Sequence, residues 1–352
     1  MWIRAFGSTL AGSLLCGCYV MQAATGQLDV MRRSEPISNV LADPATTAST
    51  RSGLERVVAA RAFAEKELGL PASKSFREYA DLGRPYVVWN VVATPEFSVE
   101  PLRWCFPVAG CVAYRGYFAE SSAQSMASKL SRRGDDVSVG GVGTYSTLGH
   151  LADPVFHSML GWGETQLVGT IFHELAHEQL YFPGDSEFNE AFASVVEEEG
   201  IRRWLLASGR ESDLAAFTVA AEREAEFAKL LRDARGKLAG LYASGLPSDE
   251  MRIEKQREFG RLKYAYAGLR HQWGGYGGYD AWFSRPLNNA MLASVATYHD
   301  CMPGLRLELE RAGSLPAFYE HARETGAGLT PSQRRAAFCT PSVSGTTAAA
   351  GR

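Results

Sequence analysis

The segment HELAH at residues 173–177 constrains this chain more than any other. Leu167, Ile171 and Leu175 recur every four residues through it, which predicts an amphipathic helix with one buried face. His173 and His177 then lie one turn apart on the same face, with roughly 5 to 6 Å between their Cβ atoms. This spacing allows both imidazoles to bind a single metal ion.

A second helix should supply the third protein ligand that a catalytic zinc site needs. Residues 181–186 contain Pro and Gly followed by a capping Asp or Ser, which predicts a tight antiparallel helical hairpin. With the turn centred near residues 183 and 184, Glu190 lies level with His177. Glu197 would lie roughly 10 Å farther along the helix axis. The hairpin therefore favours Glu190 over Glu197 as the third ligand.

Glu174 follows the first histidine directly and can reach the position that three protein ligands leave open for water. A carboxylate at that place is suited to act as a general base. We therefore predict one zinc ion held by His173, His177 and Glu190, with Glu174 as the base. A purely structural zinc site would not need Glu174, so its presence favours hydrolysis over a catalytically silent zinc-binding protein.

The remaining pattern divides the chain into a short mixed region and a long helical one. A helical pattern covers about residues 26–68, and another covers 120–133. Segments rich in β-branched and aromatic residues predict strands at 86–93, 111–118 and 136–142. From about residue 164 to 324 the pattern is almost wholly helical. These elements predict an α+β fold, with a small sheet before the HELAH helix and a mostly helical C-terminal half.

The N-terminus has the composition of an export signal. One arginine precedes a mostly apolar stretch at residues 5–15. Residues 15–18 (LCGC) resemble the bacterial lipobox, which implies that residues 1–17 are a lipoprotein signal peptide and that lipidated Cys18 anchors the protein to a membrane. Tyr19 lacks the aspartate that favours inner-membrane retention, which implies the outer membrane, facing the periplasm. A plain signal peptide with incidental cysteines is the alternative.

The other four cysteines would meet an oxidising compartment after export, which favours disulfides. Turn-forming residues lie between Cys105 and Cys111, so we expect this pair, with Cys301 left for Cys339. A zinc site formed by the four is the weaker alternative, because no CxxC spacing is present.

The charge argues against a nucleic-acid partner, and the hydropathy argues against a membrane-spanning segment after the N-terminus. The chain has 36 basic and 39 acidic residues and a formal net charge of -3, so we expect no nucleic-acid binding. After residue 20 no apolar run approaches the roughly 18 residues of a membrane span. The tail at residues 342–352 is rich in Ser, Thr and Ala and is expected to be disordered.

The HELAH segment and the FNEAFA segment at residues 188–193 together resemble the gluzincin metallopeptidases, whose third ligand commonly follows an asparagine. With the lipobox, GGVGTYSTLG at 140–149 and LNNA at 287–290, most of the chain is similar to the family of putative aminopeptidase lipoproteins of proteobacteria. The resemblance implies a single zincin-like catalytic domain over residues 18–341 that hydrolyses peptides at the cell envelope. An envelope zinc endopeptidase and a silent zinc-binding lipoprotein remain the alternatives.

The resemblance also implies roles for residues outside the hairpin. In zincins an edge strand before the metal helix commonly holds the substrate backbone, and residues 137–143 either occupy that place or form a plain strand and turn. A Tyr or His from a later helix commonly steadies the oxyanion, which implies that Tyr298 is a second catalytic residue. Glu164 and Glu187 are candidates to bind the free amine of a substrate.

Overall fold

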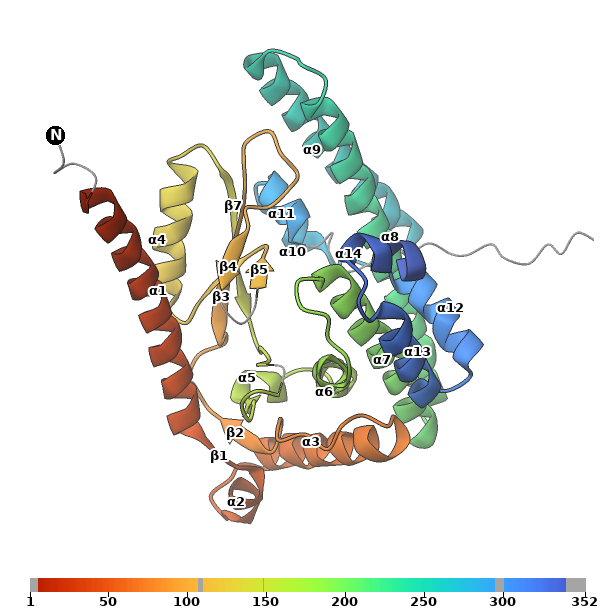
Figure 1. Ribbon diagram of the computed structural model, residues 1–352. Coiled ribbons are helices and arrows are strands. Elements are labelled where there is room, and N and C mark those ends of the chain that lie inside the picture. Colours follow the sequence, from red (N-terminus) through yellow and green to blue (C-terminus); the bar gives the residue numbers. More distant parts are fainter. Residues whose placement is uncertain (1–5, 107–109, 148, 295–300, 340–352) are drawn as a thin grey trace, which may run out of the picture.

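The computed structural model describes residues 6–106, 110–147, 149–294 and 301–339, and the side chains of its first helix from residue 19 onward (Figure 1). Tyr298 and the tail at 342–352 lie outside the described residues.

The helices in chain order are α1 (Phe6–Arg33), α2 (Ile37–Ala42), α3 (Ala48–Glu67), α4 (Glu120–Ser131), α5 (His157–Leu160), α6 (Glu164–Gln179), α7 (Ser186–Ala207), α8 (Glu211–Tyr242), α9 (Ser248–Gln272), α10 (Asp280–Phe283), α11 (Asn289–Ala293), α12 (Met302–Ala312), α13 (Leu315–Gly326), α14 (Pro331–Arg334) and a π-helical turn, η1 (Arg335–Cys339). The strands are β1 (Ser34–Pro36), β2 (Glu78–Ala80), β3 (Val88–Thr94), β4 (Trp104–Phe106), β5 (Gly110–Val112), β6 (Arg115–Tyr117), β7 (Asp136–Val142) and β8 (Val155–Phe156).

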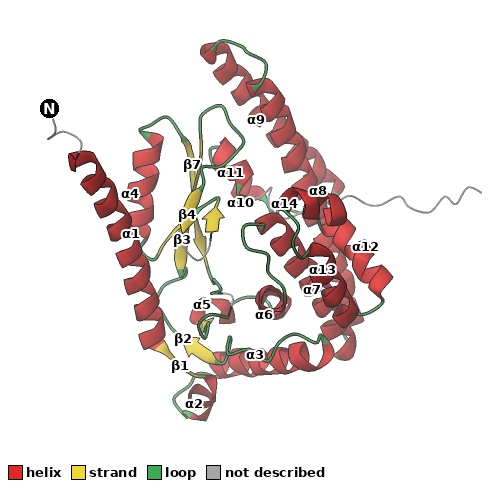
Figure 2. Ribbon diagram, in the orientation of Figure 1, coloured by secondary structure: helices red, strands yellow, loops and turns green. Residues whose placement is uncertain are grey.

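In the part of the chain that the structure describes, the strands form three small sheets, all before α6. One has the antiparallel order β6-β3-β7, with a register that runs from Val88 opposite Val142 to Thr94 opposite Asp136. A second has the order β1-β2-β8, in which β2 and β8 are parallel, and the third is the β4-β5 hairpin. Figure 2 shows the strands in one half of the molecule and the long helices α7, α8 and α9 in the other. The predicted α+β class, with a helical C-terminal half, is confirmed.

Two sequence predictions are wrong in detail. The helical pattern at residues 26–68 is not one element, because β1 and α2 separate α1 from α3. Pro36 precedes α2 and Pro44 lies in the turn after it, and proline cannot donate a backbone N–H within a helix. The predicted strand at 111–118 is two short strands, β5 and β6, because its two ends pair with different partners, β4 and β3.

The main hydrophobic core lies around α6 and α7. The side chains of Leu167, Ile171 and Leu175 are fully buried, as the four-residue repeat predicts. On α7, Phe192 stacks on Phe318 of α13, with ring centroids 5.3 Å apart. A second core lies between α8, α9 and the segment that includes α10 and α11. Within the main core, Phe63 of α3 stacks on Phe172 of α6, so the α6–α7 pair is held from both sides by apolar contacts and forms a rigid base for polar side chains.

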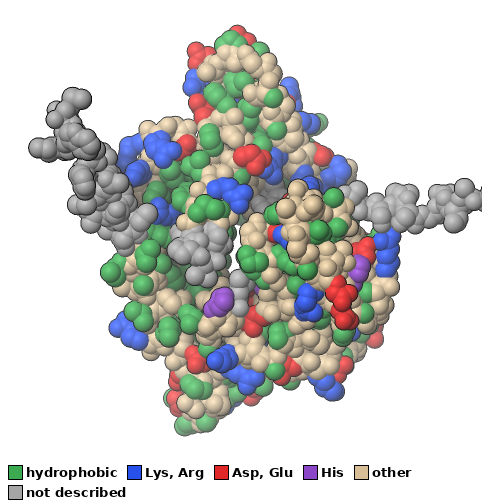
Figure 3. All heavy atoms as spheres, in the orientation of Figure 1, with side chains coloured by type: hydrophobic (Ala, Val, Ile, Leu, Met, Phe, Trp, Pro, Cys, Tyr) green, Lys and Arg blue, Asp and Glu red, His purple; other side chains and the backbone are tan. Residues whose placement is uncertain are grey.

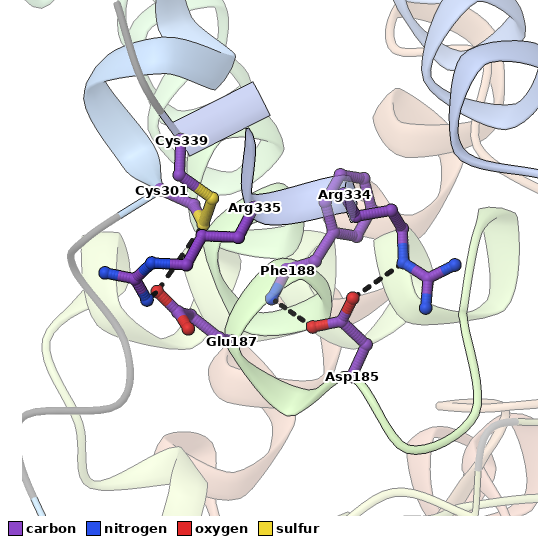
Figure 4. Close-up of a disulfide and its surroundings, with 7 residues drawn as sticks. All are labelled: Asp185, Glu187, Phe188, Cys301, Arg334, Arg335 and Cys339. Carbon is purple, nitrogen blue, oxygen red and sulfur yellow. Dashed lines mark hydrogen bonds and ion pairs between the residues drawn. A yellow bond between two sulfur atoms is a disulfide. The ribbon is translucent and has the colours of Figure 1, made fainter. Parts of the chain in front are cut away.

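Among the described side chains there are two disulfides, with the pairing that the sequence favours. Cys105 is joined to Cys111 across the β4-β5 hairpin, and Cys301 to Cys339. The second bond ties η1 to the residue that precedes α12 (Figure 4). It closes a loop of 38 residues, and a crosslink of this kind limits the conformational freedom of the unfolded chain.

The same C-terminal segment contacts the start of α7 through charged side chains. Arg334 donates to Asp185 over 2.6 Å, and both side chains are buried. Asp185 also accepts from the backbone N–H of Phe188 and so caps α7 (Figure 4). The next arginine, Arg335, forms an ion pair with Glu187. Arg334 and Arg335 thus fix the end of α7 at which the hairpin turn lies.

Replacement of Arg334 should reveal this support. Arg334→Ala leaves the buried carboxylate of Asp185 without its cation, so the free energy of unfolding should fall by about 3 to 5 kcal/mol. Arg257→Ala is the matched control, because Arg257 pairs with Glu254 on the exposed surface of α9 and should contribute less than about 1 kcal/mol. Urea unfolding of both variants measures the difference. Equal losses would mean that the buried pair does not hold the start of α7.

Candidate metal centre

His173 and His177 project from α6 toward α7. Their Nε2 atoms lie 3.2 Å apart, and their rings are nearly perpendicular, with centroids at 4.8 Å. The helices approach each other closely because glycine faces the partner helix at two points. A Cβ on Gly169 would lie 2.7 Å from Glu197, and one on Gly200 would lie 2.6 Å from Phe172. Small residues at these points therefore allow the carboxylates of α7 to reach the imidazoles of α6.

Asn189 fixes the hairpin turn that places Glu190. Its side-chain amide is fully buried, donates to the carbonyl oxygen of Phe182 and accepts from the Phe182 backbone N–H, both at 2.8 Å. Both backbone groups of the partly buried Phe182 are thereby paired. Glu190 is the next residue on α7. The asparagine therefore sets the register of the turn, and with it the position of the carboxylate that follows.

The donor atoms of His173, His177 and Glu190 converge on one point. Oε2 of Glu190 lies 3.3 Å from Nε2 of His173 and 3.7 Å from Nε2 of His177, and the two nitrogens are 3.2 Å apart. Ligand atoms at the corners of a tetrahedron, each roughly 2.0 to 2.1 Å from a central zinc ion, stand about 3.3 Å apart. Two nitrogens and one carboxylate oxygen also suit zinc chemically. The three residues therefore fit one zinc ion.

Glu197 lies against the opposite side of His173. Its Oε2 atom is 3.0 Å from Nδ1 of His173, whereas Glu190 contacts Nε2. A carboxylate on the second nitrogen of an imidazole fixes the tautomer and the orientation of the ring. The two glutamates of α7 therefore have different positions, one among the converging donor atoms and one behind His173.

The charges of the site reinforce one another. Burial tends to raise the pKa of Glu190, but hydrogen bonds from His173 and His177 outweigh it and lower the pKa to about 2. Burial opposes the charge on His173, yet hydrogen bonds to Glu190 and Glu197 hold its pKa well above the usual value. Glu174 differs, because burial raises its pKa and the charges of His173 and His177, which lower it, do not outweigh burial. A carboxyl group with a raised pKa can exchange a proton near neutral pH more readily than an ordinary one.

Tyr114, between β5 and β6, is within electrostatic reach of Glu190 and Glu174, and the sequence analysis does not single it out. Its ring is partly exposed, but the protein around it raises the pKa of the hydroxyl to about 12, through burial first and then through the negative charges of Glu190 and Glu174. Tyr181 also borders the site, with its ring 6.1 Å from that of His177. Tyr114 lies about 60 residues before the histidines, and no local sequence pattern distinguishes it.

The other predicted residues have clear positions. Glu164 is bound by Arg210 and by the indole N–H of Trp204, at the far end of α6 from His177. Glu187 pairs with Arg335 beside the Cys301–Cys339 disulfide. Both carboxylates are thus already engaged, which weakens them as binders of a substrate amine. Tyr298 lies outside the described residues.

The predicted substrate strand, β7, is an edge strand of its sheet. Part of its outer edge is already covered. The carbonyl oxygen of Val137 accepts from the side chain of Asn288 at 2.9 Å, and Arg285 donates to the carbonyl oxygen of Val139 at 3.5 Å. Its glycines, Gly140 and Gly141, lie beyond these contacts. Any extended peptide along β7 would therefore pair with its glycine end.

Comparison with known proteins gives one family. The model of the family described as "Putative aminopeptidase" matches residues 18–338, nearly the whole chain. The searches of curated proteins and of solved structures found no match. Within the described residues, no helix is both long enough and apolar enough to cross a membrane. With its HELAH helix, its hairpin and this match over residues 18–338, the chain belongs to the putative aminopeptidase family.

Proposed function

We propose that this protein is a zinc-dependent aminopeptidase that acts at the cell envelope, with the zinc ion held by His173, His177 and Glu190. The observation that carries the proposal is the convergence of two imidazole nitrogens and one carboxylate oxygen, 3.2 to 3.7 Å apart, on two rigid helices. Membership of the putative aminopeptidase family supports peptide hydrolysis. The nearby Glu174 supports a catalytic rather than a structural metal.

The residues of the site have distinct roles in this proposal. Zinc, when bound, acts as a Lewis acid toward the scissile carbonyl and lowers the pKa of water. Glu174 accepts the proton of the attacking water and passes it to the leaving amine. Glu197 holds Nδ1 of His173 and so orients the ring.

A hydroxyl group is a suitable donor to the oxyanion that forms during hydrolysis. Tyr114 is a candidate for this role, because the charges of Glu190 and Glu174 act on its hydroxyl, which is protonated at neutral pH as in any tyrosine. The resemblance to zincins implies Tyr298 for the same task. We propose Tyr114 for this role, with Tyr298, from the later part of the chain, as the alternative.

Cleavage of a mixed peptide library tests the reaction. One half of the library carries free N-termini and the other half carries acetylated N-termini. An aminopeptidase shortens only the first half, one residue at a time, because it must bind the free amine. Internal cleavage of both halves would identify an endopeptidase instead. If the zinc-loaded protein cleaves neither half, the alternative of a catalytically silent zinc-binding lipoprotein would replace the proposed peptidase.

We also propose that lipidated Cys18 anchors the protein to the outer membrane on its periplasmic side. Cys18→Ser should move the protein from the membrane fraction to a soluble form or to one that keeps its signal peptide, because the anchor is a covalent lipid. Cys16→Ser is the matched control and should stay in the membrane fraction. Fractionation and mass analysis of the N-terminus measure both. A Cys18→Ser protein with a normally cleaved signal and unchanged membrane partition would refute the anchor.

A further inference from the structure

Helix α1 packs through one face on β6, in the β6-β3-β7 sheet. The hydroxyl of Tyr19 donates to the carbonyl oxygen of Gly116 at 3.1 Å, and the guanidinium of Arg115 lies 4.0 Å from the centre of the Tyr19 ring. Gln22, nearly one turn later, donates to the same carbonyl at 3.3 Å and accepts from the backbone N–H of Phe118. These contacts begin at the residue directly after Cys18, so little free chain separates a lipid on Cys18 from the folded domain.

The opposite face of α1 is exposed and apolar. Four large hydrophobic side chains lie on it with much of their surface exposed: Val20 (60%), Met21 (65%), Leu28 (55%) and Met31 (52%). In the orientation of Figure 1, α1 forms one edge of the molecule, and Figure 3 shows hydrophobic side chains along that edge. Transfer of this much apolar surface out of water is favourable.

Charge on this face is restricted to its C-terminal end. The exposed positions of α1 from residue 20 to 33 include no acidic residue, and they end with Arg32 and Arg33. Asp29 is half-buried and pairs with both arginines. An apolar helix face that ends in arginines suits the boundary between acyl chains and anionic headgroups.

We propose that the outer face of α1, defined by Val20, Met21, Leu28 and Met31, lies in the interfacial region of the bilayer that holds the Cys18 lipid. The inference rests on the proposed anchor. A lipid on the residue before Tyr19 brings this face to the membrane surface, and the inner face of α1 is fixed to Arg115 and Gly116. Because Tyr114 directly precedes these residues, contact of α1 with the bilayer would hold the Tyr114 side of the metal centre in one orientation to the membrane.

Fluorescence quenching tests this contact in the anchored protein. Lipidated protein is reconstituted into vesicles of phosphatidylethanolamine and phosphatidylglycerol after an environment-sensitive fluorophore is attached at Met21→Cys or Leu28→Cys. Tyr264→Cys is the control, because Tyr264 is 82% exposed on α9, away from α1. Nitroxide-labelled lipids should quench the labels at 21 and 28 several-fold more than the label at 264, and aqueous iodide should show the reverse order. The same anchor is present in all three proteins, so it cannot produce the difference.

Three outcomes would overturn the inference. Equal quenching of all three labels by iodide would show that the face is in water. Labels at 21 and 28 shielded from both quenchers, together with disulfide-linked dimers of the unlabelled Leu28→Cys variant, would assign the face to a second copy of the chain. If the wild-type protein is not recovered with the vesicles, both the proposed anchor and this contact would be refuted. Loss of the proposed peptidase activity is a separate result, because lipid quenching does not depend on turnover.

Discussion

Glu174→Gln is expected to retain a full equivalent of zinc while its turnover falls by roughly 10²- to 10⁴-fold. The amide has nearly the shape of the carboxylate, so the fold and the three donor atoms stay in place. It cannot accept a proton from water, however, and the proton transfer that Glu174 performs is lost. Zinc analysis and kcat measured on the same preparation check both parts.

Glu178→Gln is the matched control for this loss. Glu178 follows His177 on α6 and accepts from the hydroxyl of Ser75 at 2.7 Å, so it is a glutamate of the same helix that has a packing contact. The control should keep most of its turnover. Wild-type turnover in Glu174→Gln would rule out the proposed base, and a loss of zinc would show that Glu174 supports the metal instead.

Glu190→Ala and Glu197→Ala should differ sharply, although both remove one carboxylate from α7. Glu190→Ala leaves only two imidazoles at the converging point, so zinc should be lost on dialysis and activity abolished. Glu197→Ala removes the partner of Nδ1 of His173, 3.0 Å away, and leaves all three donor atoms. It should lower metal affinity or activity by roughly 10- to 100-fold.

Metal analysis after dialysis separates the two glutamates. If Glu197→Ala empties the site while Glu190→Ala keeps a full equivalent of zinc, the third zinc ligand is Glu197 and not Glu190. Glu197→Gln refines the test, because its amide oxygen can still accept from Nδ1–H of His173 and should restore part of the lost affinity.

The α6–α7 hairpin can be predicted from the sequence because its determinants are local. Four-residue periodicity predicts α6, and Pro and Gly with a capping Asp predict the turn, so the juxtaposition of His177 and Glu190 follows within 14 residues. The contact between Glu197 and His173 is harder to predict. It depends on the direction of the two side chains and on the close approach of the helices at Gly169 and Gly200. The rise per residue along the helix axis predicts neither of these.

Features that depend on distant parts of the chain could not be predicted in the same way. The place of Tyr114 depends on the pairing of β5 with β4 and of β6 with β3, and pairing between strands is not encoded near Tyr114 itself. The break between α1 and α3 depends on Pro36 and on the pairing of β1 with β2, more than 40 residues later. The outward apolar face of α1 has the composition of a buried helix face, and only the packing of its opposite side shows which face is exposed.

The central claim, that one zinc ion at His173, His177 and Glu190 carries peptide hydrolysis, is tested most directly by measuring zinc content and activity on one sample during chelation and reconstitution. Wild-type protein should contain one zinc per chain, lose activity in proportion to the zinc removed and regain it when zinc is restored. His173→Ala treated in the same way should bind no zinc and remain inactive. Full activity in wild-type protein that has lost its zinc, or a full equivalent of zinc in His173→Ala, would contradict the account.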